Sequence, residues 1–170
     1  MVVTETLTVV GRPRPTAGIL VSRPSSRGMA ASHVLVPLDG SPLADEALVR
    51  ALELFDCRIT MLNVVTPLDS SMSESGVIDT DTSRRETAHE RADELIARAK
   101  RRAADEDRSI EATVETGTPA ETILAYVDDH DVDHVVMGSH GGPQTLASRL
   151  LGTVATTVVS EAPVTVTVVR

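Results

Sequence analysis

The chain has a single cysteine, Cys57, a single lysine, Lys100, and no long hydrophobic run. One cysteine cannot form an internal disulfide, and the apolar neighbours of Cys57 favour a thiol packed in the core over a nucleophile. No apolar run approaches the ~18 to 20 residues that cross a bilayer, and the first residues lack the pattern of a secretory signal. We therefore expect a soluble protein located in the cytoplasm.

The charge is acidic and unevenly distributed along the chain. The formal net charge is −9, and residues 1–28 hold four arginines and one glutamate, a net charge of +3, which leaves −12 for residues 29–170. An acidic surface repels nucleic acid and anionic membranes, so we expect neither as a partner. An acid excess with almost no lysine also fits a salt-rich cytoplasm, where salt screens the repulsion between like charges.

The length of 170 residues and the apolar share of 41% suit one domain with one packed core. Residues 1–30 are rich in proline, glycine, serine and arginine and show no sustained periodicity. We predict that they form a disordered N-terminal tail and that the domain spans residues 31–170. Met29 lies just before the first regular segment and is a candidate for the true translation start.

Apolar runs typical of buried strands alternate with amphipathic segments typical of helices from residue 33 onward. Ser41 with Pro42 predicts the start of a first helix, Thr118 opens a capping-box spacing for another, and a polar loop is expected over residues 66–84. The predicted strands cover 33–38, 58–65, 110–115, 132–137 and 164–169, and the predicted helices cover 42–55, 85–106, 118–127 and 154–159. Strands that alternate with helices predict a doubly wound, Rossmann-like α/β domain, with a five-stranded parallel sheet and helices on both faces.

Ligands of doubly wound sheets bind beyond the carboxyl ends of the strands, beside the point where the strand order reverses. In this chain those ends carry Asp39, residues 64–66, Gly117 and residues 138–142. Asp39 is placed where a carboxylate can bond a nucleoside or help to coordinate Mg²⁺, although an ordinary turn aspartate fits the position equally well.

A glycine-rich segment, M-G-S-H-G-G-P-Q-T-L-A-S-R-L-L-G-T, spans residues 137–153. Gly138, Gly141 and Gly142 would let the backbone turn tightly and approach phosphate oxygens, and Gly152 with Thr153 adds a bare stretch and a hydroxyl donor. A tight crossover turn without any ligand is the alternative. The P-loop pattern is absent, and no G-x-G-x-x-G follows the first strand, so P-loop enzymes and ordinary Rossmann dehydrogenases do not fit.

Five motifs in order give the chain a recognisable similarity. They are V-P-L-D-G-S (36–41), L-N-V-V (62–65), G-T-P-A-E-T-I (117–123), V-V-M-G-S-H-G (135–141) and L-L-G-T-V-A (150–155), followed by A-P-V-T-V-T-V-V at 162–169. Together they resemble the universal stress protein (UspA-like) family over about residues 31–170. The resemblance implies a five-stranded fold of the adenine nucleotide alpha hydrolase-like type, and a homodimer formed through the last strand.

The resemblance also implies an ATP site, with Mg²⁺ as a possible companion. ATP-binding members of this family carry G-x2-G-x9-G-[ST], whereas here the interval between the second and third glycines is one residue longer when it is counted from Gly141. Counting from Gly142 restores that interval but lengthens the first. The residues that the resemblance assigns to the nucleotide are Pro37, Leu38, Asp39, Val64, Met137, Gly138, Gly141, Gly142, Gly152, Thr153 and Val154.

No catalytic or metal-binding residue is predicted. His130 and His134 lie among four aspartates, for which solvated positions between a helix and a strand are a simpler explanation than a metal site. His140 lacks an evident catalytic partner and is interpreted as a loop residue or a hydrogen-bond donor. Two classes of function stay open: a nucleotide-binding regulatory protein of the stress response, with at most slow ATP hydrolysis, and an interaction protein that acts through its dimer without nucleotide.

Overall fold

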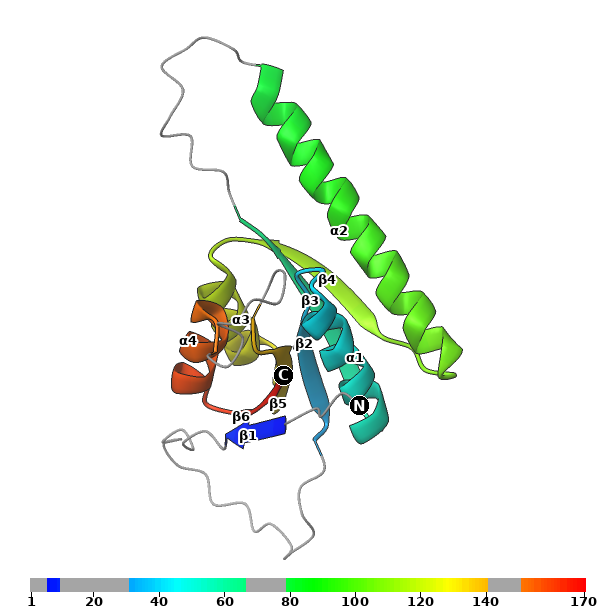
Figure 1. The fold of residues 1–170 in the computed structure, drawn as a ribbon, viewed down its shortest axis with the longest axis vertical. Coiled ribbons are helices and arrows are strands. Elements are labelled where there is room, and N and C mark those ends of the chain that lie inside the picture. The colour runs from blue at the N-terminus through cyan, green and yellow to red at the C-terminus, as the bar shows by residue number, and fades with distance from the viewer. Residues whose placement is uncertain (1–5, 10–30, 67–78, 141–150) are drawn as a thin grey trace, which may run out of the picture.

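The computed structural model describes residues 6–9, 31–66, 79–140 and 151–170 and places them in one sheet with helices on both sides (Figure 1). The strands are β1 (Thr6–Val9), β2 (His33–Pro37), β3 (Arg58–Val65), β4 (Glu111–Thr116), β5 (His134–Gly138) and β6 (Thr165–Val169). The helices are α1 (Pro42–Leu54), α2 (Asp79–Asp105), α3 (Pro119–Asp129) and α4 (Thr153–Glu161). No helix in these ranges is both long enough and apolar enough to span a membrane.

The sheet has the strand order β1-β6-β5-β2-β3-β4. The five strands from β2 to β6 are parallel, which confirms the predicted doubly wound α/β fold. The sixth strand, β1, was not predicted and lies in the segment interpreted as a tail. It pairs antiparallel with β6, with Thr6 opposite Val169 and Val9 opposite Val166.

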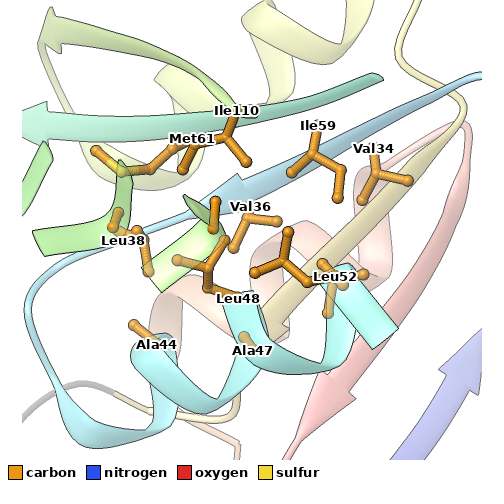
Figure 2. Close-up of a cluster of buried hydrophobic side chains, with 14 of the residues drawn as sticks. Val34, Val36, Leu38, Ala44, Ala47, Leu48, Leu52, Ile59, Met61 and Ile110 are labelled. Atoms are coloured by element: carbon orange, nitrogen blue, oxygen red, sulfur yellow. The ribbon is translucent and has the colours of Figure 1, made fainter. Parts of the chain in front are cut away.

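The core has two layers, one on each face of the sheet. On one face, α1 and the second half of α2 cover β2 and β3, where Leu48 and Leu52 pack near Val34 and Val36 (Figure 2). On the other face, α3 and α4 cover β5 and β6. The continuous apolar runs of the parallel strands are explained by this burial on both sides.

The starts of the helices agree in part with those predicted from the sequence. Ser41 caps α1, since its side-chain oxygen accepts from the N–H of Ala44 at 3.2 Å, and Pro42 occupies the first helical position. Thr118 is the residue before α3, but its side chain makes no capping bond, so the expected capping box is wrong. Helix α2 begins at Asp79, six residues before its predicted start, where acidic side chains at a helix N-terminus are favoured by the helix dipole. The rest of the predicted loop, residues 67–78, lies outside the described residues.

The strand order reverses between β2 and β5. From β2 the chain continues outward through β3 to β4, and from β5 it continues in the other direction to β6. In a doubly wound sheet this reversal opens a crevice at the carboxyl ends of the two central strands.

Candidate functional site

A cavity of about 380 Å³ lies at this crevice. Its volume is within the ~300 to 1,000 Å³ of small-molecule sites. Nine of the eleven residues that the sequence assigned to a ligand line it, and the other two, Gly141 and Gly142, lie outside the described residues. The nine are Pro37, Leu38, Asp39, Val64, Met137, Gly138, Gly152, Thr153 and Val154.

Seven further residues complete the cavity wall, and the sequence did not assign them to a ligand. They are Ser41, Ala44, Leu62, Pro119, Ile123, His140 and Ala155. Pro119 and Ile123 belong to α3, which covers the face of the sheet beside the cavity. The motif at 117–123 was the available signal for them, because it follows β4 at the same edge of the sheet as the other motifs.

Hydrogen bonds fix the turn after β2, which supplies Leu38 and Asp39. The N–H of Leu38 donates to Leu62 O at 2.9 Å, and the buried Asn63 side chain donates through Nδ2 to Leu38 O at 2.7 Å. Asp39 Oδ1 accepts from the N–H of Ser41 at 2.9 Å. No residue of the described chain donates to the other carboxylate oxygen of Asp39, which leaves that oxygen available to a ligand.

The first turn of α4 meets the cavity at Gly152, Thr153 and Val154. Gly152 is the N-cap residue and has no side chain, so the N–H groups of this turn receive no side-chain cap from it. Unpaired N–H groups at a helix N-terminus and the positive end of the helix dipole favour an anion. Among the described lining residues there is no lysine or arginine, so this helix end is the principal positive feature of the wall.

Gly152 also lies against the end of β5. A Cβ atom at this position would be 3.2 Å from His140 Cβ and 3.3 Å from Ser139 O, tighter than ordinary contact. The missing side chain therefore serves the packing of α4 against the β5 end as well as access to the cavity.

Gly138 lines the cavity, and packing gives a reason of its own for a glycine at this position. A Cβ atom at Gly138 would lie 3.0 Å from the Cβ and from the carbonyl carbon of Leu43. The glycine is required because the first turn of α1 packs directly on it, and the prediction that its bare backbone serves the approach of a phosphate is not needed to explain it.

His140 reaches the cavity wall from the segment after β5. Its Nδ1 is 2.9 Å from Ser139 Oγ, and its Nε2 is buried without a hydrogen-bond partner. Ser139 is only 1% exposed, so its hydroxyl cannot reach a substrate as a nucleophile. The pair is therefore not suited to covalent catalysis, and His140 contributes to the cavity wall without offering a free ring nitrogen to it.

The other histidines considered in the sequence lie away from the cavity and apart from each other. The ring of His130 stacks on Tyr126 with centroids 3.8 Å apart, whereas His134 packs against Phe55 and meets Thr167 Oγ1 at 2.9 Å. Burial lowers the pKa of His134. In the part of the chain that the structure describes, no three His, Cys, Asp or Glu side chains are grouped so that they could hold a metal ion.

Cys57 lies next to the start of β3, at the end of the sheet opposite to the cavity, and packs against the core. Burial raises the pKa of the Cys57 thiol, which disfavours the thiolate needed for nucleophilic attack. This environment agrees with a packing role.

A profile of the Universal stress protein family matches residues 31–170. The comparison with curated protein sequences gives no match. Universal stress protein UspA from Lactobacillus plantarum is 24% identical, with a TM-score of 0.72 over 84% of this chain and 100% of that one. A universal stress protein in complex with cAMP is 22% identical, with a TM-score of 0.62 over 83% and 98% of the two chains. A universal stress protein family protein from Arabidopsis thaliana with AMP bound is 21% identical, with a TM-score of 0.56 over 79% and 90%.

The doubly wound sheet with a cavity at its switch point defines an open α/β protein of Rossmann-like architecture. The chain belongs to the universal stress protein family.

Proposed function

We propose that this protein binds an adenine nucleotide, ATP in the first instance, in the cavity at the switch point of its sheet. The observation that carries the proposal is that all nine described residues of the predicted nucleotide set line one cavity. They come from four separate segments of the chain, so a coincidence of sequence motifs would not by itself bring them together.

The wall offers a different chemistry to each part of a nucleotide. The side chains of Leu38, Val64, Ile123 and Met137 form an apolar region suited to a base. The free oxygen of Asp39 suits the ribose hydroxyls. The first turn of α4 suits the phosphates, since its N–H groups can donate hydrogen bonds to an anion.

Relatives support the ligand class. Two proteins with the same fold contain cAMP and AMP, respectively. Both ligands share adenosine and one phosphate. ATP adds to this shared part the β and γ phosphates, for which Mg²⁺ is the proposed counter-ion.

The proposed role is regulatory. Nucleotide occupancy would be sensed by a homodimer formed through the β6 edge, in the cytoplasm. Hydrolysis would be slow at most, since among the described lining residues no hydroxyl is hydrogen-bonded to a side chain that could act as its general base. An interaction protein with an empty site is the second candidate. It is favoured by the extra residue in the glycine segment, which makes the sequence interval between Gly141 and Gly152 one residue longer than in ATP-binding members of the family.

Isothermal calorimetry with ATP, ADP, AMP and cAMP, with and without Mg²⁺ and at near-physiological salt, separates the two candidates. We expect saturable heat for at least one of these ligands. Val64→Trp, which fills the cavity, should abolish it, whereas Leu54→Trp, at an exposed position on α1, should not. No heat for any nucleotide with the unmodified protein would contradict the proposal and favour the second candidate.

A further inference from the structure

The β6 edge is where the sheet would otherwise end, and β1 covers it. An uncovered edge strand presents a row of unpaired N–H and C=O groups that can pair with another chain. The orientation of these groups follows from one bond. Ser139 N donates to Val169 O at 2.8 Å, so the backbone of Val169 faces β5. Because the groups alternate along a strand, those of Val166 and Val168 face the free edge.

The strand that covers this edge is a near copy of β6. Residues 6–10 read T-L-T-V-V and residues 165–169 read T-V-T-V-V, identical at four of five positions. In the structure Leu7 lies opposite Val168, and Val9 lies opposite Val166. The four residues of β1 therefore correspond, position by position, to residues 165–168 of β6.

The register of this pairing is the one that a second copy of β6 would take. Thr6 corresponds to Thr165 and Thr8 corresponds to Thr167. If β6 of a second copy took the place of β1, its Thr165 would therefore lie opposite Val169, and its Thr167 would lie opposite Thr167 of the first copy. That arrangement is symmetric about a twofold axis through Thr167. A symmetric contact of this kind closes as a dimer and leaves no further edge to extend.

We propose that β1 is an internal mimic of β6 which occupies, within one chain, the edge where β6 of a second copy of this chain pairs. The two pairings are mutually exclusive, so β1 controls dimer formation. This inference rests on the homodimer proposed above and is independent of the nucleotide. β1 has four residues, and among the described strands it pairs with β6 alone. Since 23 residues separate it from β2, it can leave without breaking a parallel strand pair.

The effect on dimerisation follows from mass action. If β1 covers the edge in about 99% of molecules, both copies must be uncovered before they pair, so the apparent dissociation constant of the dimer is about 10,000-fold higher than that of an uncovered chain. The full chain is then monomeric at concentrations where a chain without β1 is dimeric. A product that starts at Met29 would lack β1 altogether.

Two proline variants of the full chain test the proposal as a matched pair. Leu7→Pro removes an N–H that faces β6, because Leu7 lies opposite the edge-facing Val168, whereas Thr8→Pro removes one that faces away. In sedimentation velocity over a concentration series, we expect Leu7→Pro to dimerise with an apparent dissociation constant about tenfold or more below that of Thr8→Pro and of the unmodified chain. The same assembly in both variants would overturn the proposal.

A chain of residues 29–170 provides a second test, after its circular dichroism and thermal melt have been compared with those of the full chain. We expect a dimer that a synthetic peptide of residues 4–10 dissociates. A full chain that is dimeric while the shortened chain is monomeric would overturn the proposal, because β1 would then join two chains. Calorimetry with ATP on the same proteins keeps the two proposals distinguishable, since none of these changes touches a residue that lines the cavity.

Discussion

The N–H of Gly152 donates to the carbonyl oxygen of Ser139 at 2.7 Å. This bond ties the first turn of α4 to the end of β5, although thirteen positions of sequence numbering separate the two residues. The two ends of the glycine-rich segment are thereby held at one side of the cavity, whatever the intervening residues do. The geometry of the helix end that would meet a phosphate is set by this contact.

Gly152→Val should weaken ATP binding more than adenosine binding. The branched side chain would crowd His140 and Ser139 and displace the helix end that is proposed to meet the phosphates. Losing one or two hydrogen bonds to a charged group predicts about a tenfold to hundredfold loss for ATP. Calorimetry with both ligands measures the difference, and a thermal melt checks that the fold is retained. Equal losses for ATP and adenosine would show that this helix end does not contact the phosphates.

Asp39→Asn should lower the affinity for adenosine and ATP alike, by about fivefold. Asparagine keeps an oxygen that can accept from the N–H of Ser41, so the turn is preserved while the charge offered to the ribose hydroxyls is lost. Asp39→Ala, which loses both, should bind still more weakly. Unchanged affinity in the asparagine variant would mean that the carboxylate serves only the turn.

Asn63→Ala should destabilise the protein by about 1 to 3 kcal/mol, because it removes the buried donor to Leu38 O and leaves that oxygen unpaired. Urea unfolding at constant pH measures the loss. We also expect weaker nucleotide binding, because the turn that carries Leu38 and Asp39 would be displaced. Since Asn63 does not line the cavity, this effect would be indirect. Full affinity in a destabilised variant would show that the turn keeps its position without this bond.

His134 should make the protein less stable at mildly acidic pH. Burial lowers its pKa in the folded state, so below its ordinary value of about 6.5 the unfolded chain binds the proton more readily than the folded one. The contribution to stability is complete above that value and is lost as the pH falls toward the folded pKa.

The difference between unfolding midpoints in urea at about pH 7.5 and pH 5.5 measures this effect. His134→Gln removes the titration while keeping a polar group near Thr167, and should reduce the difference. An equal pH dependence in both proteins would assign the effect to other groups.

Much of the fold, and most of the residues that line the cavity, could be predicted because the signals are local. The turn at Asp39 and the bare stretch at Gly152 each follow or precede an apolar run, and parallel strands bring such ends to one edge of the sheet. The contribution of Ile123 could not be predicted from its own neighbourhood, since it depends on how α3 lies across the sheet. The packing of Gly138 against Leu43 could not be predicted, because a contact with a residue far away in sequence is invisible in a glycine pattern.

The strand β1 was missed for a similar physical reason. Four residues are too few to show a periodicity, and the partner of Thr6 is Val169, at the other end of the chain. The early start of α2 at Asp79 was missed because aspartate, threonine and serine are common in loops, and only their place at a helix N-terminus makes them favourable in a helix.

The cavity is lined by residues from both halves of the sheet, on either side of the point where the strand order reverses. Pro37 and Val64 belong to the half that continues to β4, whereas Met137 and Thr153 belong to the half that continues to β6. Any molecule held there contacts both halves at once and would oppose their local separation. Amide hydrogens on both sides of the centre should then exchange more slowly with solvent when the cavity is filled, so that occupancy is registered throughout the sheet.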